Sequence, residues 1–156
     1  IDCKIKWVND IYCNGKKLCG ILTEAAIDVE QGGLEYAVIG LGVNVINTFF
    51  PKNIENIATS IMEQCGHTVS RSELAAEILN KLEEKLEHIE DSSMIEEYRR
   101  RSCLIDKRII VTKSNETAAV GICTGFDELG RLLVRYDDGT DAVLNSGTIR
   151  LENQPE

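Results

Sequence analysis

The first two dozen residues carry the side chains most able to do chemistry. Asn14-Gly15 lies between two β-prone runs and favours a two-residue hairpin turn, because both positions of a type I′ turn need positive φ. Side-chain alternation then gathers four polar residues on one face of the hairpin: Lys6, Asp10, Tyr12 and Lys17. Two lysines, a carboxylate and a phenol could hold a phosphate and a metal ion. They could equally form a surface salt-bridge patch worth less than about 1 kcal/mol.

The turn also predicts the pairing of the two hairpin strands. The expected partners across the turn are Cys13 with Lys16, Tyr12 with Lys17, Ile11 with Leu18, and Asp10 with Cys19. In this register Asp10 and Lys17 are diagonal neighbours, roughly 7–8 Å apart at Cα. A long side chain or a bridging ligand can span that separation.

A second candidate site is the segment Gly40-Leu41-Gly42-Val43-Asn44. Its glycines would let a ligand approach the backbone, and the Asn44 carboxamide offers a donor and an acceptor to the edge of a base. The segment lacks the third glycine and the following helix of a dinucleotide-binding fingerprint. The alternative is a strand bulge that Asn44 caps.

Periodicity predicts the elements that must position these residues. Residues 1–45 alternate apolar and polar side chains, which is typical of an antiparallel meander. Residues 51–102 have helical spacing, and residues 103–152 return to five short strands, which favour a small barrel over an open sheet with exposed edges. We therefore expect an α+β fold, in which an antiparallel mixed sheet with helices precedes a small β-barrel.

Three helices are expected within the helical passage. The first has an apolar stripe from Ile54 to Cys65 and ends at Gly66. The second follows a capping box at residues 70–73, in which a serine and a glutamate satisfy each other's backbone donors. The third is capped at Ser93 and runs through residue 98, with the arginines at 99–101 as a charge cap at its C-terminal end.

Composition narrows the class of protein. The 156 residues carry 17 basic and 26 acidic side chains, a net charge of −9, which argues against nucleic-acid binding. Residues 1–20 alone have a local charge of +2, which favours a local anion site. The sequence contains no run of about 18 apolar residues, so it predicts no membrane-spanning helix. The six cysteines fit no zinc-binding pattern and are interpreted as reduced residues of a cytoplasmic protein.

Three ordered motifs in this chain resemble those of biotin protein ligases. The family motifs K-W-P-N-D, K-L-A-G-I-L-x-E and G-x-G-x-N correspond to residues 6–10, 17–24 and 40–44. Val8 replaces the usual proline and Cys19 the usual alanine. The closing strands resemble the family's SH3-like C-terminal domain in their glycines and turns: Gly121, Gly125, Asp127, Gly130, Asp138-Gly139 and Ser146-Gly147.

The resemblance implies a fold, two domains and a reaction. Residues 1–102 would be the C-terminal part of a catalytic domain of the class II synthetase and biotin ligase type, and residues 103–153 the SH3-like domain. The family joins biotin to ATP, giving biotinyl-5′-AMP and pyrophosphate, and then transfers biotin to a lysine of a carboxylase's biotin carboxyl carrier domain. A homodimer is possible.

The resemblance also implies residue roles. Lys17 would be catalytic and would lie between the biotin carboxylate and the α-phosphate of ATP. The biotin pocket would be lined by Lys17, Gly20, Ile21, Leu22, Gly40 and Gly42. Asn44 would read adenine, Asp10 would bind the nucleotide through Mg²⁺, and Lys6 would support Asp10 or the acceptor side.

One family feature is missing from this sequence. The glycine- and arginine-rich loop G-R-G-R-x-G-R, which folds over biotin and the adenylate phosphate, does not occur, and the chain opens on Ile1 inside a predicted strand. We therefore expect the N-terminus to be a cut and residues 1–156 alone to have little or no ligation activity. Two alternatives stay open: a lipoate ligase-like enzyme, and a catalytically inactive interaction or scaffold fragment.

Overall fold

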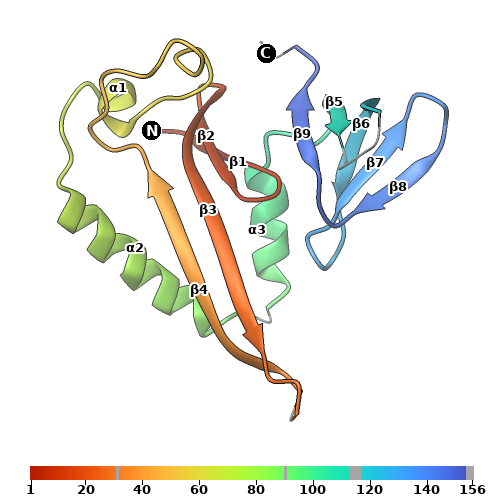
Figure 1. The fold of residues 1–156 in the computed structure, drawn as a ribbon, viewed down its shortest axis with the longest axis horizontal. Coiled ribbons are helices and arrows are strands. Elements are labelled where there is room, and N and C mark those ends of the chain that lie inside the picture. The colour runs from red at the N-terminus through yellow and green to blue at the C-terminus, as the bar shows by residue number, and fades with distance from the viewer. Residues whose placement is uncertain (31, 90, 113–116, 154–156) are drawn as a thin grey trace. The chain divides into compact units, whose positions relative to one another are not determined.

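The computed structural model describes residues 1–30, 32–89, 91–112 and 117–153 (Figure 1). The chain divides into two compact units, considered separately below. The first comprises Ile1–Asp2 and Asn9–Val69, and the second comprises Cys3–Val8 and the chain from Ser70 onward. Within the described residues, no helix is long and apolar enough to cross a membrane.

An antiparallel arrangement of three strands forms the first unit: β2 (Asp10–Cys13), β3 (Lys16–Ile27) and β4 (Leu34–Val43). The hairpin turn is confirmed, with Asn14 and Gly15 at φ of 48° and 77°. Cys13 pairs with Lys16 and Tyr12 with Lys17, as expected.

The register predicted beyond Tyr12 is wrong. A β-bulge between Ile11 and Tyr12 shifts the pairing, so that Ile11 faces Cys19 and Asp10 faces Gly20. A bulge places two residues of one strand opposite one of the other and bends the strand locally. The shift moves Asp10 one residue further along β3 than the uninterrupted hairpin allows.

The β3–β4 ribbon changes from buried to exposed along its length. Leu18 and Cys19 are buried, whereas Leu22, Ile27 and Leu34 expose 61%, 69% and 66% of their surface in this structure. The part of the ribbon at Leu18 and Cys19 is therefore buried, whereas the far end, which includes Ile27 and Leu34, exposes apolar side chains. Figure 1 shows β3 and β4 running side by side along the length of this ribbon.

The first helix is shorter than the sequence predicted. Helix α1 spans only Ile61–Cys65, with the Ser60 side chain as its N-cap and Gly66 at a φ of 76° as its C-cap. The prediction of helix from Ile54 onward is wrong, because Ala58 forms a parallel bridge with Lys17 of β3. Pairing with a strand uses the backbone groups that a helix would need, whereas the predicted stop at Gly66 is confirmed.

The second unit contains strand β1 (Cys3–Lys6), helix α2 (Arg71–Leu86) and helix α3 (Ser93–Arg101). The predicted cap of α2 is confirmed in part, since the Ser70 hydroxyl accepts a hydrogen bond from the Glu73 backbone at 3.3 Å. The predicted cap of α3 is wrong: Ser93 is the first helical residue, and its backbone donates to the Asp91 carboxylate at 2.8 Å. Helix α3 also continues to Arg101, three residues past its expected end.

A five-stranded antiparallel sheet follows, in the order β8-β7-β6-β5-β9. Its strands are β5 (Arg108–Thr112), β6 (Ala119–Phe126), β7 (Leu132–Tyr136), β8 (Asp141–Leu144) and β9 (Thr148–Leu151). The five strands were all expected from the sequence, and the α+β class is confirmed. Among the described residues the sheet order ends at β8 and β9, with no ladder joining these two strands.

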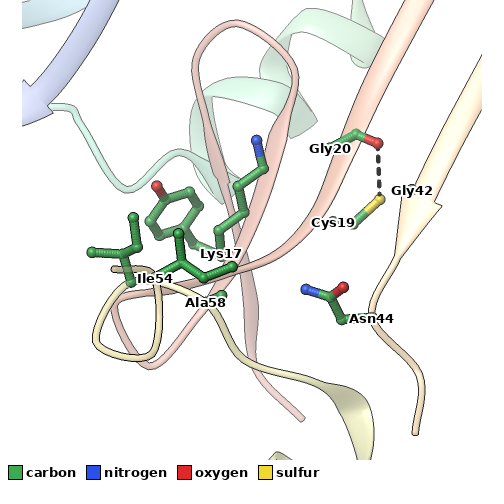
Figure 2. Close-up of a pocket in the computed structure, with 9 residues that line it drawn as sticks. Lys17, Cys19, Gly20, Gly42, Asn44, Ile54 and Ala58 are labelled. Carbon is green, nitrogen blue, oxygen red and sulfur yellow. Dashed lines mark hydrogen bonds between the residues drawn. The ribbon is translucent and has the colours of Figure 1, made fainter. Parts of the chain in front are cut away.

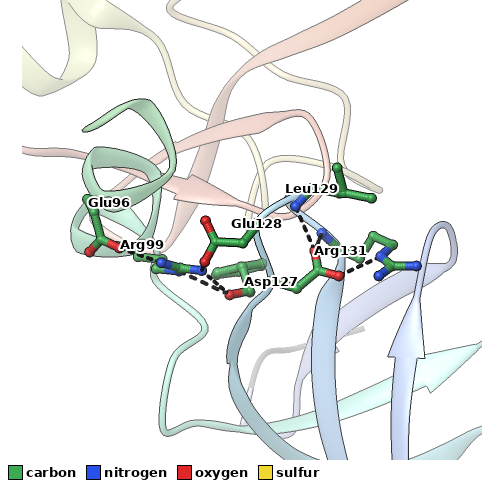
Figure 3. A network of polar contacts seen from close by, with 7 residues as sticks. Glu96, Arg99, Asp127, Glu128, Leu129 and Arg131 are labelled. Carbon is green, nitrogen blue, oxygen red and sulfur yellow. Dashed lines mark hydrogen bonds and ion pairs between the residues drawn. The ribbon is translucent and has the colours of Figure 1, made fainter. Parts of the chain in front are cut away.

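An apolar cluster and a polar network tie the second unit together. Leu104, Ile109 and Leu132 are completely buried, and the indole of Trp7 donates to the Gly130 carbonyl at 3.0 Å. Figure 3 shows Arg99 of α3 directed at Glu96 and Glu128 and at the end of β6. Its guanidinium donates twice to the Phe126 carbonyl, at 3.0 and 2.8 Å. The charge cap predicted for residues 99–101 is thus, at Arg99, a link from α3 to the sheet.

Candidate functional site

The base of the β3–β4 ribbon contains a pocket of about 380 Å³ (Figure 2). A volume of this size is in the usual range for small-molecule sites. The pocket is lined by Tyr12, Lys17, Cys19, Gly20, Gly42, Asn44, Ile54, Ile57 and Ala58. Strands β2 and β3, the end of β4 and the loop before α1 thus each supply part of its wall.

An ion pair lies at this pocket. The Lys17 ammonium is 2.6 Å from the Asp10 carboxylate, and the two side chains are 44% and 21% exposed. Asp10 faces Gly20 across the two strands, and the Lys17 and Asp10 side chains meet over that glycine. Gly20 leaves room for the lysine, since a Cβ there would lie 3.2 Å from Lys17 Nζ. A cation held at an open pocket beside a carboxylate is suited to binding an anion, with the carboxylate available to a metal ion.

Cys19 contributes a buried thiol to the pocket wall. Burial raises the pKa of this thiol, the nearby Asp10 carboxylate raises it further, and Lys17 opposes both effects. The thiol donates to the Gly20 carbonyl at 3.5 Å. Cys19 is therefore protonated at neutral pH and acts as a small apolar wall.

Asn44 closes the pocket at the end of β4. Its side-chain amide donates to the Thr59 carbonyl at 3.0 Å, and its backbone N–H donates to the Leu18 carbonyl at 3.0 Å. Its own carbonyl accepts from the Ile61 backbone at 2.9 Å. The Asn44 backbone is therefore fixed from both sides, and the Thr59 carbonyl holds its carboxamide.

The other residues expected to bind biotin have different positions. Gly42 pairs with Gly20, and Gly40 pairs with Leu22. Because side chains alternate along a strand, both pairs lie on the same face of the ribbon. The Gly40–Leu22 pair lies two residues further from the pocket than the Gly42–Gly20 pair. Ile21 lies on the opposite face by the same alternation, and its backbone N–H donates to the Asn9 carbonyl at 2.8 Å. The pocket brings together Lys17, Gly20, Gly42 and Asn44, whereas Ile21, Leu22 and Gly40 are not part of its lining. Lys6 belongs to the second unit.

Residues 54–58 form a wall of the pocket that the sequence did not reveal. Ile54, Ile57 and Ala58 all line it. Ile54 and Ile57 have the spacing of an apolar helix stripe, which is why the sequence predicts a helix here. The Lys17 N–H donates to the Ile57 carbonyl at 2.7 Å, and this contact across 40 residues has no local sequence signal.

Two protein-family profiles match separate parts of the chain. Residues 1–44 match the "Biotin/lipoate A/B protein ligase family", and residues 104–151 match the "Biotin protein ligase C terminal domain". The first matched stretch contains Asp10, Lys17 and Asn44. Both stretches are thus similar to ligases of the biotin and lipoate class.

Individual relatives agree with both profiles. A biotin–[acetyl-CoA-carboxylase] ligase of Mycobacterium tuberculosis is 30% identical over 147 residues, covering 93% of this chain and 52% of that protein. The apo structure of a biotin protein ligase from Aquifex aeolicus has a TM-score of 0.82 and 22% identity, covering 97% of this chain and 66% of the other. A structure of the Aquifex ligase in complex with biotin and ATP has a TM-score of 0.79 and 23% identity, covering 97% and 63%.

The chain is a relative of the biotin protein ligases, as its three motifs predicted. It spans about half the length of the curated relatives it matches.

Proposed function

We propose that residues 1–156 form part of an ATP-dependent biotin–carboxylase ligase. The observation that carries this proposal is the Lys17–Asp10 ion pair at a pocket that also contains Asn44, because these three residues come from the three motifs. The proposed reaction has two steps. A biotin carboxylate oxygen attacks the α-phosphorus of ATP and releases pyrophosphate. A lysine amine of the acceptor then attacks the acyl carbon and releases AMP.

Lys17 is the proposed catalytic residue. Two anions, a carboxylate and a triphosphate, must approach each other in the first step, and a fixed ammonium between them reduces their repulsion. The same ammonium stabilises the negative charge that grows on the phosphate oxygens in the transition state. The pairing with Asp10 supports this role, since it holds the flexible lysine side chain in place before substrate binds.

Asp10 is the proposed metal-binding residue. Mg²⁺ in nucleotide sites is typically held by one or two carboxylates together with substrate phosphates and water, and the Asp10 carboxylate at the pocket fits that donor set. When bound, Mg²⁺ would neutralise phosphate charge. Asp10 would share its oxygens between the metal and Lys17, and Lys6 is proposed to support the nucleotide side.

The remaining proposed roles follow the pocket walls. Gly20 and Gly42 would let biotin approach the two backbones closely, with Gly40, Ile21 and Leu22 continuing the biotin-binding strand pair. Asn44 would read adenine. Because its amide nitrogen donates to Thr59, its carboxamide oxygen is the group that would accept from the exocyclic amine.

The proposal extends to the domains, the partner and the location. We assign residues 1–102 to the catalytic domain and residues 103–153 to the SH3-like domain. The acceptor would be a biotin carboxyl carrier domain, and a homodimer is possible. The six cysteines are free, which agrees with a reducing, cytoplasmic location.

A lipoate ligase is the second candidate, because the profile that matches residues 1–44 includes both classes. The match of residues 104–151 to the biotin protein ligase C-terminal domain favours biotin. A non-catalytic scaffold is the third, and it would need neither Lys17 nor a nucleotide.

A substrate comparison separates these candidates. The natural polypeptide that carries residues 1–156 is incubated with ATP, Mg²⁺ and either biotin or lipoate, and pyrophosphate release is measured. We expect release with biotin and little with lipoate. A preference for lipoate would replace the first proposal with the second. No release with either acid, from a protein that is folded by circular dichroism, would favour the scaffold.

A further inference from the structure

Two hydroxyl residues are buried beside the pocket without lining it. Thr59 and Ser60 are 1% and 0% exposed, and they are the buried polar residues among those the structure describes. A buried hydroxyl costs free energy unless it is hydrogen-bonded. The partners of this pair therefore indicate what its burial achieves.

The backbone of Thr59 contacts both ends of the proposed substrate site. Its N–H donates to the Lys17 carbonyl at 2.9 Å, and its carbonyl accepts from the Asn44 side chain at 3.0 Å. The chain just before it adds a third bond, from the Lys17 N–H to the Ile57 carbonyl at 2.7 Å. The backbone of a single residue thus links the lysine of β3 to the asparagine at the end of β4.

The side chain of Thr59 connects the same residue to α1 and to the hairpin turn. Its hydroxyl donates to the Glu63 carboxylate at 3.0 Å and accepts from the Gln64 amide at 2.8 Å. The Gln64 amide oxygen in turn accepts from the Asn14 side chain at 2.7 Å. The hydroxyl is therefore satisfied within a chain of bonds that reaches the turn between β2 and β3.

Ser60 fixes the opposite side. Its hydroxyl donates to the Asn47 carbonyl at 2.5 Å and accepts from the Glu63 backbone at 3.2 Å, which also caps α1. The following residue, Ile61, donates its backbone N–H to the Asn44 carbonyl. The dipeptide is held on both sides, and neither of its side chains lines the pocket.

We propose that Thr59 and Ser60 are positioning residues that set the spacing between Lys17 and Asn44. This inference rests on the proposed function, in which Lys17 contacts the carboxylate and α-phosphate and Asn44 contacts adenine. A ligand that bridges both residues needs the correct spacing, whereas a ligand that contacts Lys17 alone does not. The pair therefore selects for the bridging adenylate over its separate parts.

The test compares a bridging ligand with a short one. Affinities for a non-hydrolysable biotinyl-AMP analogue and for biotin alone are measured by calorimetry, using the natural polypeptide that carries residues 1–156. Thr59→Val keeps the side-chain shape and removes the hydroxyl. We expect the variant to bind the analogue about tenfold more weakly, the effect of about one hydrogen bond, and to bind biotin within about twofold of the unmodified protein.

Two further variants define the role. Thr59→Ser restores the hydroxyl and is expected to recover most of the affinity for the analogue. Thr148→Val is the matched control, because Thr148 is an exposed residue of β9 in the second unit. If Thr59→Val does not fold, Gln64→Met replaces it, since this change removes the amide between Thr59 and Asn14 at a half-buried position. It is expected to show the same difference between the ligands.

The possible outcomes are distinct. Equal losses for the analogue and for biotin would assign Thr59 a merely structural role and overturn the inference. Unchanged affinity for the analogue would overturn it as well. Failure of the unmodified protein to bind either ligand would instead overturn the proposed function.

Discussion

The two compact units of this chain bury different kinds of side chain. In the second unit, ten buried residues from Trp7 to Ile149 form one cluster of apolar side chains. In the first unit, apolar residues such as Leu18 and Phe50 are buried together with two hydroxyl residues, Thr59 and Ser60. Both units gain stability from removing apolar surface from water, but the first also uses buried hydroxyl hydrogen bonds to fix the geometry around a pocket.

This difference predicts that the same kind of substitution has different consequences in the two units. Changes in the second unit should lower the free energy of unfolding. Changes around the pocket should lower ligand affinity or activity at nearly constant stability. The four predictions below test this contrast, from the largest expected effect to the smallest.

Leu132→Ala should have the largest effect. Leu132 is completely buried in the apolar cluster, and truncating such a residue costs about 2–5 kcal/mol of unfolding free energy. The measurement is urea unfolding of residues 1–156 followed by tryptophan fluorescence, because Trp7 is the one tryptophan of the chain and belongs to that cluster. Leu129→Ala is the control, since Leu129 is 78% exposed and its loss should cost less than about 0.5 kcal/mol. Similar losses for both variants would contradict the contrast.

Lys17→Ala should act on chemistry instead of stability. Removing a charged group that stabilises the transition state lowers kcat by about 10²–10³-fold, so biotin-dependent pyrophosphate release by the natural polypeptide that carries residues 1–156 should fall by that factor. The unfolding free energy should change by no more than about 1 kcal/mol, because the pair with Asp10 is partly exposed. Lys16→Ala is the matched control, because the Lys16 ammonium donates to the Glu55 carbonyl instead. An equal loss of activity in the control would remove Lys17 from its proposed role.

A pair of glycine substitutions tests both sides of the contrast. A Cβ at Gly121 would lie 2.6 Å from the Arg135 carbonyl oxygen, so Gly121→Ala should destabilise the sheet by about 1–3 kcal/mol. A Cβ at Gly42 would meet only the Gly20 carbonyl, at the ordinary contact distance of 3.6 Å. Gly42→Ala should therefore fold normally, and its methyl group should weaken biotin binding by roughly tenfold by taking up pocket space. Thermal unfolding and calorimetry measure the two effects, and a stability loss in Gly42→Ala that matched that of Gly121→Ala would refute the distinction.

The smallest expected effect is a pH dependence in the second unit. Hydrogen bonds from the Arg108 guanidinium, at 3.0 and 2.9 Å, hold the pKa of the Asp137 carboxyl below its ordinary value of 3.8. Because the folded-state pKa lies below the unfolded one, this carboxylate stabilises the fold at neutral pH. The contribution is lost as the pH falls below about 3.8 through the folded-state pKa.

Arg108→Gln removes the cause of that pKa shift. Its unfolding free energy should be slightly lower than that of the unmodified protein at pH 7, and the difference should shrink between pH 4 and pH 2. Urea unfolding at a series of pH values measures this. Arg108 also pairs with Glu152, so Asp137→Asn in the Arg108→Gln background isolates the aspartate and should have no further pH-dependent effect. A difference that grew on acidification would contradict the assignment.

Much of the fold was predictable because its signals are local. The turn at Asn14-Gly15, the cap at Ser70, the stop at Gly66 and the five strands of the second unit each depend on a few adjacent residues. The helix predicted from Ile54 failed because its stripe faces a pocket and its backbone pairs with Lys17, contacts that lie about 40 residues away in sequence. The register of Asp10 failed because a bulge has no fixed residue signature.

The candidate site divides in the same way. Sequence motifs identified Asp10, Lys17, Gly42 and Asn44 as functional candidates, since their residue types carry the required charge, space or hydrogen-bonding groups. Only the tertiary structure brought Asp10 within 2.6 Å of Lys17 and added residues 54–58 as a pocket wall. It also showed that Thr59 links Lys17 to Asn44. Side-chain chemistry belongs to a residue alone, whereas a distance depends on how distant segments pack, and so the sequence determined the chemistry of this site and the fold decided its geometry.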